Sequence, residues 1–224
     1  MKYCIVNGDD FGASHGIVRG ILEALERGIL TSTSLLVDMP ASAAAAAAAR
    51  SLARLGVGLH FDLGRPPVGG SLVAVRCELR RQLERFFVLM DAPPTHLDAH
   101  HNTQRRADLL PCFQEIAARH ELPLREHSKV RYFPSFYGRW NGETHPEQIS
   151  VETLLRMLDE LDEGISELAC HPGYLEPGFT SDYGPERELE LRTLCDPRLR
   201  VALDRLEIRL IDHRDVPRLA RITS

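Results

Sequence analysis

The chain has 224 residues, of which 43% are hydrophobic and 26% charged, and its formal net charge is −5 with neutral histidines. A negative charge without a stripe rich in lysine and arginine argues against a nucleic-acid partner, and no apolar run is long enough to cross a membrane. The five widely spaced cysteines include no CxxC pair, and the N-terminal stretch soon becomes acidic, which predicts a reduced, cytoplasmic protein.

Short apolar runs alternate with helical patterns along the chain. The apolar runs predict strands, and apolar residues three and four positions apart predict helices. A segment dense in alanine predicts a helix closed by Gly56. In chain order, the expected elements are strand 3–7, helix 17–29, strand 31–39, helix 41–56, strand 57–63, helix 77–90, strand 95–100, helix 109–121, short strand 123–128, helix 151–163, strand 166–173, helix 187–205 and strand 208–215.

The repeated alternation of strand and helix predicts the fold class. It favours an α/β protein with a parallel sheet inside and helices outside. Seven or so such units indicate a closed or nearly closed (β/α) barrel of the TIM-barrel kind, formed by residues 1–224 as a single domain. An open doubly wound sheet is the alternative. The segment 128–148, with the only tryptophan, Trp140, is expected to form a loop over the mouth of the barrel, with room for a short strand.

Polar residues lie at or near the ends of several expected strands. Asp9 and Asp10 end the first strand, His60 lies in the third, and His171 lies near the end of the strand 166–173. Because the carboxyl ends of parallel strands meet at one edge, we expect these side chains to gather at one mouth of the barrel. This convergence is the main physical argument for a functional site.

The fourth strand contributes the stretch THLDAH. Residues two apart point to the same side of a strand, so His96, Asp98 and His100 are expected to share one face. Two imidazoles and a carboxylate suit a divalent cation such as Zn²⁺ with an open position for water. Asp10 can supply an acidic ligand, which leaves Asp9 as a base for water whose pKa the metal lowers.

Each of these signals also has a purely structural interpretation. The sequence DDFG can cap the start of a helix, with Gly12 making the turn. A lone His60 can be a hydrogen-bonded core residue, and His171 can belong to a turn. Ionisable groups on one buried strand are costly unless a metal or a network pairs them, so the combination favours a site. The remaining histidines are expected to be surface or capping groups: His15, His120, His127, His145 and His213.

Taken in order, five motifs resemble those of one family. The stretches NGDDFG, TSTSLLV, GLHFDL, PTHLDAHHN and CHPGY follow one another through most of the chain. They resemble the YdjC-type carbohydrate deacetylases, which include chitooligosaccharide deacetylases and hopanoid-biosynthesis deacetylases. The resemblance implies a distorted (β/α) barrel, one divalent metal ion, either Zn²⁺ or Mg²⁺, and removal of acetyl from an N-acetylated sugar or oligosaccharide. A homodimer is implied by family likeness only.

The resemblance also implies roles for individual residues. Asp10, His60 and His100 would bind the metal. Asp9 would be the general base that activates water. His171 would be the general acid that protonates the leaving amine.

Three further residues are implied in supporting roles. His96 and Asp98 would orient metal ligands or bond to the substrate, and Arg125 would orient Asp9 or bind substrate. The chain departs from the family in having Gly8 where alanine is usual, HHNTQRR in place of a longer histidine run, and a short stretch between the third and fourth strands. These departures bear on the substrate more than on the metal.

Two other functions are open at this point. A metal-dependent phosphoesterase or amidohydrolase on a similar barrel usually has a His-x-His pair on its first strand, where this chain has Asp9 and Asp10. A non-catalytic barrel that keeps a metal and binds a sugar is expected to lose its base or its acid, whereas Asp9 and His171 are both present. The deacetylase reaction is therefore the favoured hypothesis.

Overall fold

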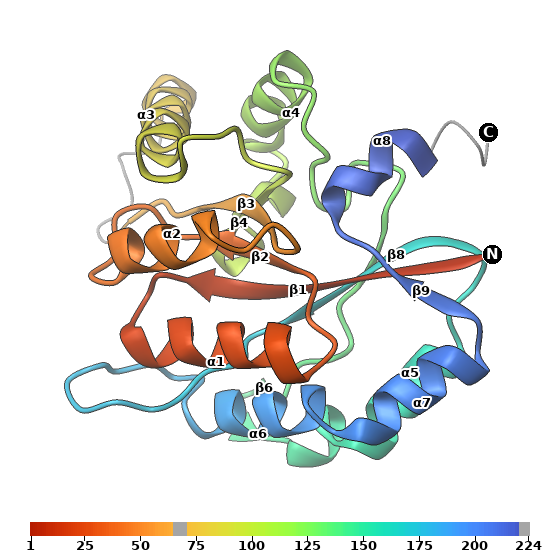
Figure 1. Cartoon of the computed structure of the whole chain (residues 1–224). Helices are drawn as coiled ribbons and strands as arrows, with labels where there is room; N and C mark the ends of the chain where they lie inside the picture. Colours follow the sequence, from red (N-terminus) through yellow and green to blue (C-terminus); the bar gives the residue numbers. More distant parts are fainter. Residues whose placement is uncertain (65–70, 220–224) are drawn as a thin grey trace.

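The computed structural model describes residues 1–64 and 71–219, and its centre is a parallel sheet (Figure 1). Its seven strands are β1 (Lys2–Phe11), β2 (Ser32–Leu35), β3 (Gly56–Phe61), β4 (Leu97–Ala99), β5 (Arg131–Phe133), β8 (Gly164–Cys170) and β9 (Ile208–Leu210). Six of them follow the order β4-β3-β2-β1-β8-β5, and β9 also pairs with β1. All these pairings are parallel, as the alternating sequence pattern predicts.

Strand β1 organises the sheet because it is its longest strand, with 10 residues. One edge pairs with β8 from Lys2 to Gly8. The other edge pairs with β9 over residues 2–4 and then with β2 over residues 7–11. A parallel strand covered on both faces is typically a continuous apolar run, and the apolar centre of β1 is accordingly buried.

Helices cover the outside of the sheet. They are α1 (His15–Arg27), α2 (Ser42–Arg50), α3 (Leu72–Met90), α4 (Leu110–Arg119), α5 (Val151–Asp159), α6 (Pro185–Leu194), α7 (Pro197–Arg205) and α8 (Val216–Leu219), with 3₁₀ helices η1 (His100–Arg105), η2 (Pro146–Ile149) and η3 (His213–Asp215). In Figure 1, α1 and α6 lie side by side below β1, and α5 lies beside α7. On the other side, α2 packs against α3, which packs against α4.

The sheet curls into a distorted, incomplete barrel, which confirms the predicted α/β class. Over residues 1–64 and 71–219 the path of paired strands does not return from β5 to β4. Beside β4, the Leu97 amide donates to the Pro123 carbonyl at 2.9 Å, and the Arg125 amide donates to the Leu97 carbonyl at 3.0 Å. The expected strand 123–128 is therefore reduced to one parallel bridge, which places Arg125 beside the end of β4.

The carboxyl ends of the strands meet on one side of the molecule. In Figure 1, β1 starts at the N terminus on the right and ends on the left, where the segment after β8 also runs. This segment lies directly against α1: a Cβ on Gly20 would be 2.5 Å from the Cα of Gly173. The Tyr174 amide also donates to the Gly16 carbonyl at 3.1 Å. This close packing holds the residues after β8 near the end of β1.

Several expected helices are shorter or interrupted in the structure. Helix α2 ends at Arg50, and Gly56 begins β3 instead of closing the helix. The expected helix 187–205 is two helices, interrupted between Leu194 and Pro197. Proline lacks the N–H that a continuous helix needs, whereas it is well suited to the first turn of a new one.

The segment 128–148 contains more regular structure than a loop. Strand β5 pairs with β8 in the main sheet. A small antiparallel hairpin follows, formed by β6 (Arg139–Trp140) and β7 (Glu143–Thr144). Trp140 is 42% exposed, and its ring stacks on His145 with 3.5 Å between the ring centroids. The expected short strand is thus present, together with a hairpin.

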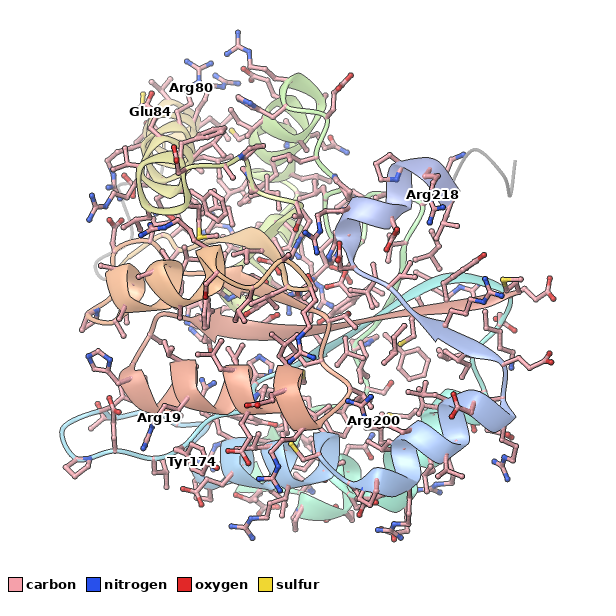
Figure 2. All side chains as sticks on the ribbon, viewed as in Figure 1. Arg19, Arg80, Glu84, Tyr174, Arg200 and Arg218 are labelled. Atoms are coloured by element: carbon pink, nitrogen blue, oxygen red, sulfur yellow. The ribbon has the colours of Figure 1, made fainter. Side chains whose placement is uncertain are left out.

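Charged side chains cover much of the outside of the protein. Figure 2 shows Arg80 and Glu84 on α3 and Arg218 on α8 at its periphery. Across the described ranges, we find no helix with both the length and the apolar character needed to cross a membrane. Several polar side chains are nevertheless buried, and a group of them lies at the carboxyl ends of the strands.

Candidate active site

Asp9 and Asp10 both face the same group of residues although they are neighbours in a strand. Adjacent side chains of a regular strand point to opposite faces. Here the register of β1 against β2 shifts between Gly8 and Phe11, and Asp10 has a φ of 66°. This left-handed conformation is uncommon for a residue other than glycine, and irregular strand ends of this kind re-aim side chains beside active sites. Both carboxylates are therefore buried in one site.

The structure brings together Asp10, His60 and His100. One possible ligand atom from each lies within 4.8 Å of the others. Asp10 Oδ1 is 3.4 Å from His60 Nε2 and 3.1 Å from His100 Nδ1, yet it has no properly oriented hydrogen bond from any described residue. A buried carboxylate oxygen without a partner is costly. Because an oxygen and two imidazole nitrogens are suitable ligands for Zn²⁺, the three residues fit a divalent cation.

Asp98 orients His60. His60 Nδ1 donates to Asp98 Oδ1 at 2.7 Å, which leaves Nε2 facing Asp10. Metal-binding histidines commonly donate their other ring N–H to a carboxylate in this way. Burial lowers the pKa of His60, but Asp98 and Asp10 outweigh this effect and raise it to about 10. A bound cation would take the place of the proton on Nε2.

His100 reaches the site from just beyond the strand. Strand β4 ends at Ala99, and His100 begins η1, so the alternation expected for THLDAH stops before His100. His101 and Asn102 follow with φ values of 54° and 51°, which turn the chain sharply. The side chain of His100 is 29% exposed, whereas that of His60 is 2% exposed. His100 is therefore the residue of this group that faces solvent.

Arg125 lies buried among three carboxylates. It donates to both oxygens of Asp9 at 2.8 and 2.9 Å, and to Glu167 Oε1 at 2.8 Å. It is also 2.7 Å from Asp98 Oδ2. Burial lowers the pKa of Arg125, but these carboxylates outweigh burial and raise it well above its usual range. Because the guanidinium is buried, its position favours holding Asp9 over contacting substrate.

Asp9 is held in place as an ionised carboxylate. Its Oδ1 also accepts a hydrogen bond from Asn7 Nδ2 at 2.8 Å. Burial raises the pKa of Asp9, but the guanidinium of Arg125 outweighs burial and holds this pKa well below its usual range. Asp9 Oδ2 is 4.0 Å from His171 Nε2. The predicted base and the predicted acid are therefore neighbours.

His171 follows β8 directly and lies at the edge of the site, with its side chain 21% exposed. Burial lowers the pKa of His171 to about 4, although the negative charges of Asp9 and Asp10 act to raise it. The ring is therefore neutral near pH 7. Its Nδ1 is buried and has no hydrogen-bond partner within the described part of the chain. A neutral imidazole of this kind can take up and release a proton during a reaction.

Three residues near His171 were not anticipated from the sequence: Tyr183, Arg187 and Glu190. Glu190 accepts hydrogen bonds from the backbone amide of His171 and from the hydroxyl of Tyr183. Burial raises the pKa of Glu190 to about 8. Arg187 donates to Asp10 Oδ2 at 2.5 Å, so Asp10 is left with Oδ1 toward the two histidines.

The charged residues of α6 give a misleading signal in the sequence. On α6, Glu186 and Arg187 lie four and three positions before Glu190, so each is on the same helix face as Glu190. A charged face of this kind is usually solvated, but all three residues are buried here. Only tertiary packing identifies them: Arg187 and Glu190 contact the segment after β8, and Glu186 contacts Arg139 and Thr144 of the β6–β7 hairpin.

His96 lies away from the mouth of the site. Its ring is buried and stacks on His213, with 3.6 Å between the centroids. Its Nε2 is 3.9 Å from Asp98 Oδ2, and a Cβ on Gly58 would lie 2.3 Å from its ring. This burial favours support of Asp98 over contact with substrate. The expectation that His213 is a surface or capping group is wrong, because His213 is buried and its Nδ1 lies 3.1 Å from Ser32 Oγ, while Asp212 caps η3.

The structure also decides between two interpretations of DDFG. Ser14 is the residue that caps α1, since its hydroxyl accepts a hydrogen bond from the Ile17 amide at 3.2 Å. Asp9 and Asp10 lie within β1 and do not cap the helix. The helix-cap alternative for the two aspartates is therefore wrong.

Comparisons with known proteins find relatives along most of the chain. The family model described as YdjC-like protein matches residues 3–205. A carbohydrate deacetylase from Geobacillus stearothermophilus is 34% identical, over 97% of this chain and 99% of the relative. A chitooligosaccharide deacetylase from Serratia marcescens is 32% identical, over 90% of this chain and 94% of the relative.

Two solved structures are similar in fold. One, from Enterococcus faecalis V583, is described as a candidate cellobiose-phosphate cleavage protein; it has a TM-score of 0.83 at 26% identity, over 96% of this chain and 98% of that one. The other is a family 4 carbohydrate esterase from Streptomyces lividans, solved with acetate. It has a TM-score of 0.62 at 14% identity, over 93% of this chain and 91% of that one, and this likeness concerns the fold alone.

Proposed function

Because the chain belongs to the YdjC-like protein family, we propose that it is a carbohydrate deacetylase, a hydrolase that removes the acetyl group from an N-acetylated sugar or oligosaccharide. The names of two relatives, carbohydrate deacetylase and chitooligosaccharide deacetylase, support this substrate class. The observation that carries the proposal is the convergence of Asp10, His60 and His100 beside Asp9 and His171.

We assign one divalent cation, Zn²⁺ or Mg²⁺, to Asp10, His60 and His100. The two imidazoles favour Zn²⁺, because Mg²⁺ prefers oxygen ligands. When bound, such a cation polarises a carbonyl and lowers the pKa of water. The unpartnered Asp10 oxygen and the hydrogen bond that aims His60 support this assignment.

In the proposed reaction, Asp9 accepts a proton from the water that attacks the acetyl carbonyl. Arg125 fixes the carboxylate of Asp9 in position for this step. His171, whose Nε2 is 4.0 Å from Asp9 Oδ2, receives the proton and donates it to the amine nitrogen as the C–N bond breaks. The neutral ring of His171 suits this order, because it gains its proton during the reaction. The products are acetate and the free amino sugar.

Other parts of the proposal concern the surroundings of the reaction. Asp98 orients His60, and His96 packs behind Asp98.

A cytoplasmic location is supported by five free cysteines. The net charge of −5 supports a small-molecule substrate over a nucleic acid. The homodimer and the extent of the domain over residues 1–224 stay predictions.

The test is acetate release from N,N′-diacetylchitobiose and N-acetylglucosamine. The protein is stripped with a chelator and then supplied with Zn²⁺ or Mg²⁺. We expect acetate only after a metal is restored. Release of phosphate from 4-nitrophenyl phosphate without any acetate would favour the phosphoesterase alternative. Sugar binding without release of acetate would favour the non-catalytic alternative.

A further inference from the structure

One exposed aromatic ring lies directly beside the proposed acid. The ring of Tyr137 is in edge contact with His171, with 5.6 Å between the centroids and 67° between the planes. Tyr137 is 39% exposed, whereas its two chain neighbours, Phe136 and Gly138, are buried. An exposed aromatic face beside reacting groups is unusual for packing alone, because burial is what stabilises such a ring.

Packing against Tyr183 holds the ring of Tyr137 at this position. Its ring stacks on Tyr183 with 4.7 Å between the centroids and 8° between the planes, so Tyr183 covers one face. The hydroxyl of Tyr183 accepts a hydrogen bond from the Gly138 amide at 2.9 Å and donates one to Glu190. Glu190 also accepts from the amide of His171. A chain of hydrogen bonds therefore joins the backbone beside Tyr137 to the backbone of His171, and the ring of Tyr137 is held by its stack on Tyr183.

We propose that Tyr137 is the surface on which the pyranose ring of the substrate stacks. This inference rests on the proposed function. The nitrogen that His171 protonates is attached directly to the sugar ring, so that ring must lie close to His171. The C–H faces of a pyranose are apolar, and aromatic side chains bind such faces while a few polar groups fix orientation. The substrate class is thus a pyranose that carries an acetamido group, not an open-chain amide.

The chain offers a matched control in Trp140. Trp140 is 42% exposed, close to the value for Tyr137, and it lies three residues further along the same segment. Its ring stacks on His145, which follows β7. If the loss of any exposed aromatic side chain from this segment weakened substrate binding, substitution of either residue would raise KM. If the substrate stacks beside His171, only substitution of Tyr137 would raise KM.

The experiment compares Tyr137→Ala, Tyr137→Phe and Trp140→Ala. With N-acetylglucosamine, we expect Tyr137→Ala to raise KM about 3- to 10-fold, the range expected for the loss of one aromatic contact. Tyr137→Phe and Trp140→Ala should keep the KM of the unchanged protein. Trp140→Ala should also release acetate from 4-nitrophenyl acetate, which lacks a pyranose, at the rate of the unchanged protein. Equal KM values for Tyr137→Ala and the unchanged protein would overturn the inference, as would an equal loss in Trp140→Ala.

A second measurement separates this inference from the proposed reaction. Binding of N,N′-diacetylchitobiose is measured by calorimetry on metal-loaded protein, with Asp9→Asn as the background so that turnover does not interfere. Tyr137→Ala in this background should weaken binding by a similar factor. If the unchanged protein releases no acetate but Tyr137→Ala still weakens binding, the proposed reaction fails and the stacking surface stands. Unaltered binding, or no binding at all, overturns the stacking surface.

Discussion

The two sides of the site differ in how their charges are arranged. On the side of the strands, Arg125 holds Asp9 as a carboxylate, and Asp10 keeps one oxygen without a hydrogen bond. On the side of α6, burial lowers the pKa of His171 to about 4 and raises that of Glu190 to about 8. The strand side therefore presents fixed negative charge, which suits a cation.

Two groups on the α6 side, His171 and Glu190, instead favour their neutral forms near pH 7. Burial penalises the charged form of any side chain, and only a nearby opposite charge or a hydrogen bond offsets this penalty. Arg125 provides that charge for Asp9, whereas the hydrogen bonds to Glu190 do not outweigh its burial. One site can therefore contain a group of residues that binds a cation and a second group that exchanges protons. The two groups differ because the charges and hydrogen bonds around them differ.

The largest expected effect comes from Asp9→Asn on the strand side. We expect the rate of acetate release to fall about 10²- to 10⁴-fold, the usual range for a general base, while the metal content stays at one ion per chain. Asp38→Asn is the control, because Asp38 is an exposed aspartate paired with Arg81. If Asp9→Asn keeps a rate within about tenfold of the unchanged protein, Asp9 is not the base.

The next effect concerns Glu190 and the pH dependence of stability. Its pKa of about 8 in the folded protein exceeds the ordinary value of 4.5, so the folded state binds more protons between these pH values. The free energy of unfolding should therefore fall as pH rises from 4.5 to 8, by up to a few kcal/mol for this one group. Glu190→Gln should flatten that slope, as measured by denaturant titration at several pH values with a chelator present.

Glu186→Gln is the matched control for this slope. Glu186 lies one turn earlier on α6, and despite burial its pKa is lowered by hydrogen bonds from Thr144 and Arg139. A lowered pKa affects stability only as pH falls below the ordinary value of this group. The slope between pH 4.5 and 8 should therefore be unchanged in Glu186→Gln. A slope that persists in Glu190→Gln would show that another group causes it.

A smaller effect is expected when His60 loses its orienting carboxylate. Asp98→Ala removes the acceptor of the His60 Nδ1 proton. Because partners of this kind align a ligand and increase its basicity, we expect metal affinity to fall about 10- to 100-fold. Competition with a chromogenic chelator measures this affinity directly. An unchanged affinity would mean that packing alone orients His60.

The smallest effect is expected at the N-cap of α1, which lies outside both groups of site residues. Ser14→Ala removes the hydroxyl that accepts from the Ile17 amide. The free energy of unfolding should fall by about 1 kcal/mol, as for other N-cap serines. Both the metal affinity and the KM for sugar should stay unchanged. A loss of metal affinity in Ser14→Ala would mean that the start of α1 positions the end of β1.

Much of the strand side could be predicted from the sequence. Asp9, Asp10, His60 and Asp98 lie on or at the ends of apolar runs, and the alternation with helices predicts that such ends meet. The left-handed conformation of Asp10 could not be predicted, because it depends on the irregular pairing of β1 with β2. His100 was expected on the strand face, but it reaches the site from η1.

The sequence by itself determined the class of fold, because alternating apolar runs and amphipathic segments can bury their apolar faces in few other ways. It also indicated the group of acids and histidines at the strand ends, because the carboxyl ends of parallel strands meet at one edge of the sheet. Only the tertiary structure placed Glu190 and Tyr183 beside His171 and buried His213 against His96. These contacts join distant segments, and whether a charged helix face meets solvent or a neighbouring segment depends on packing that local sequence does not encode.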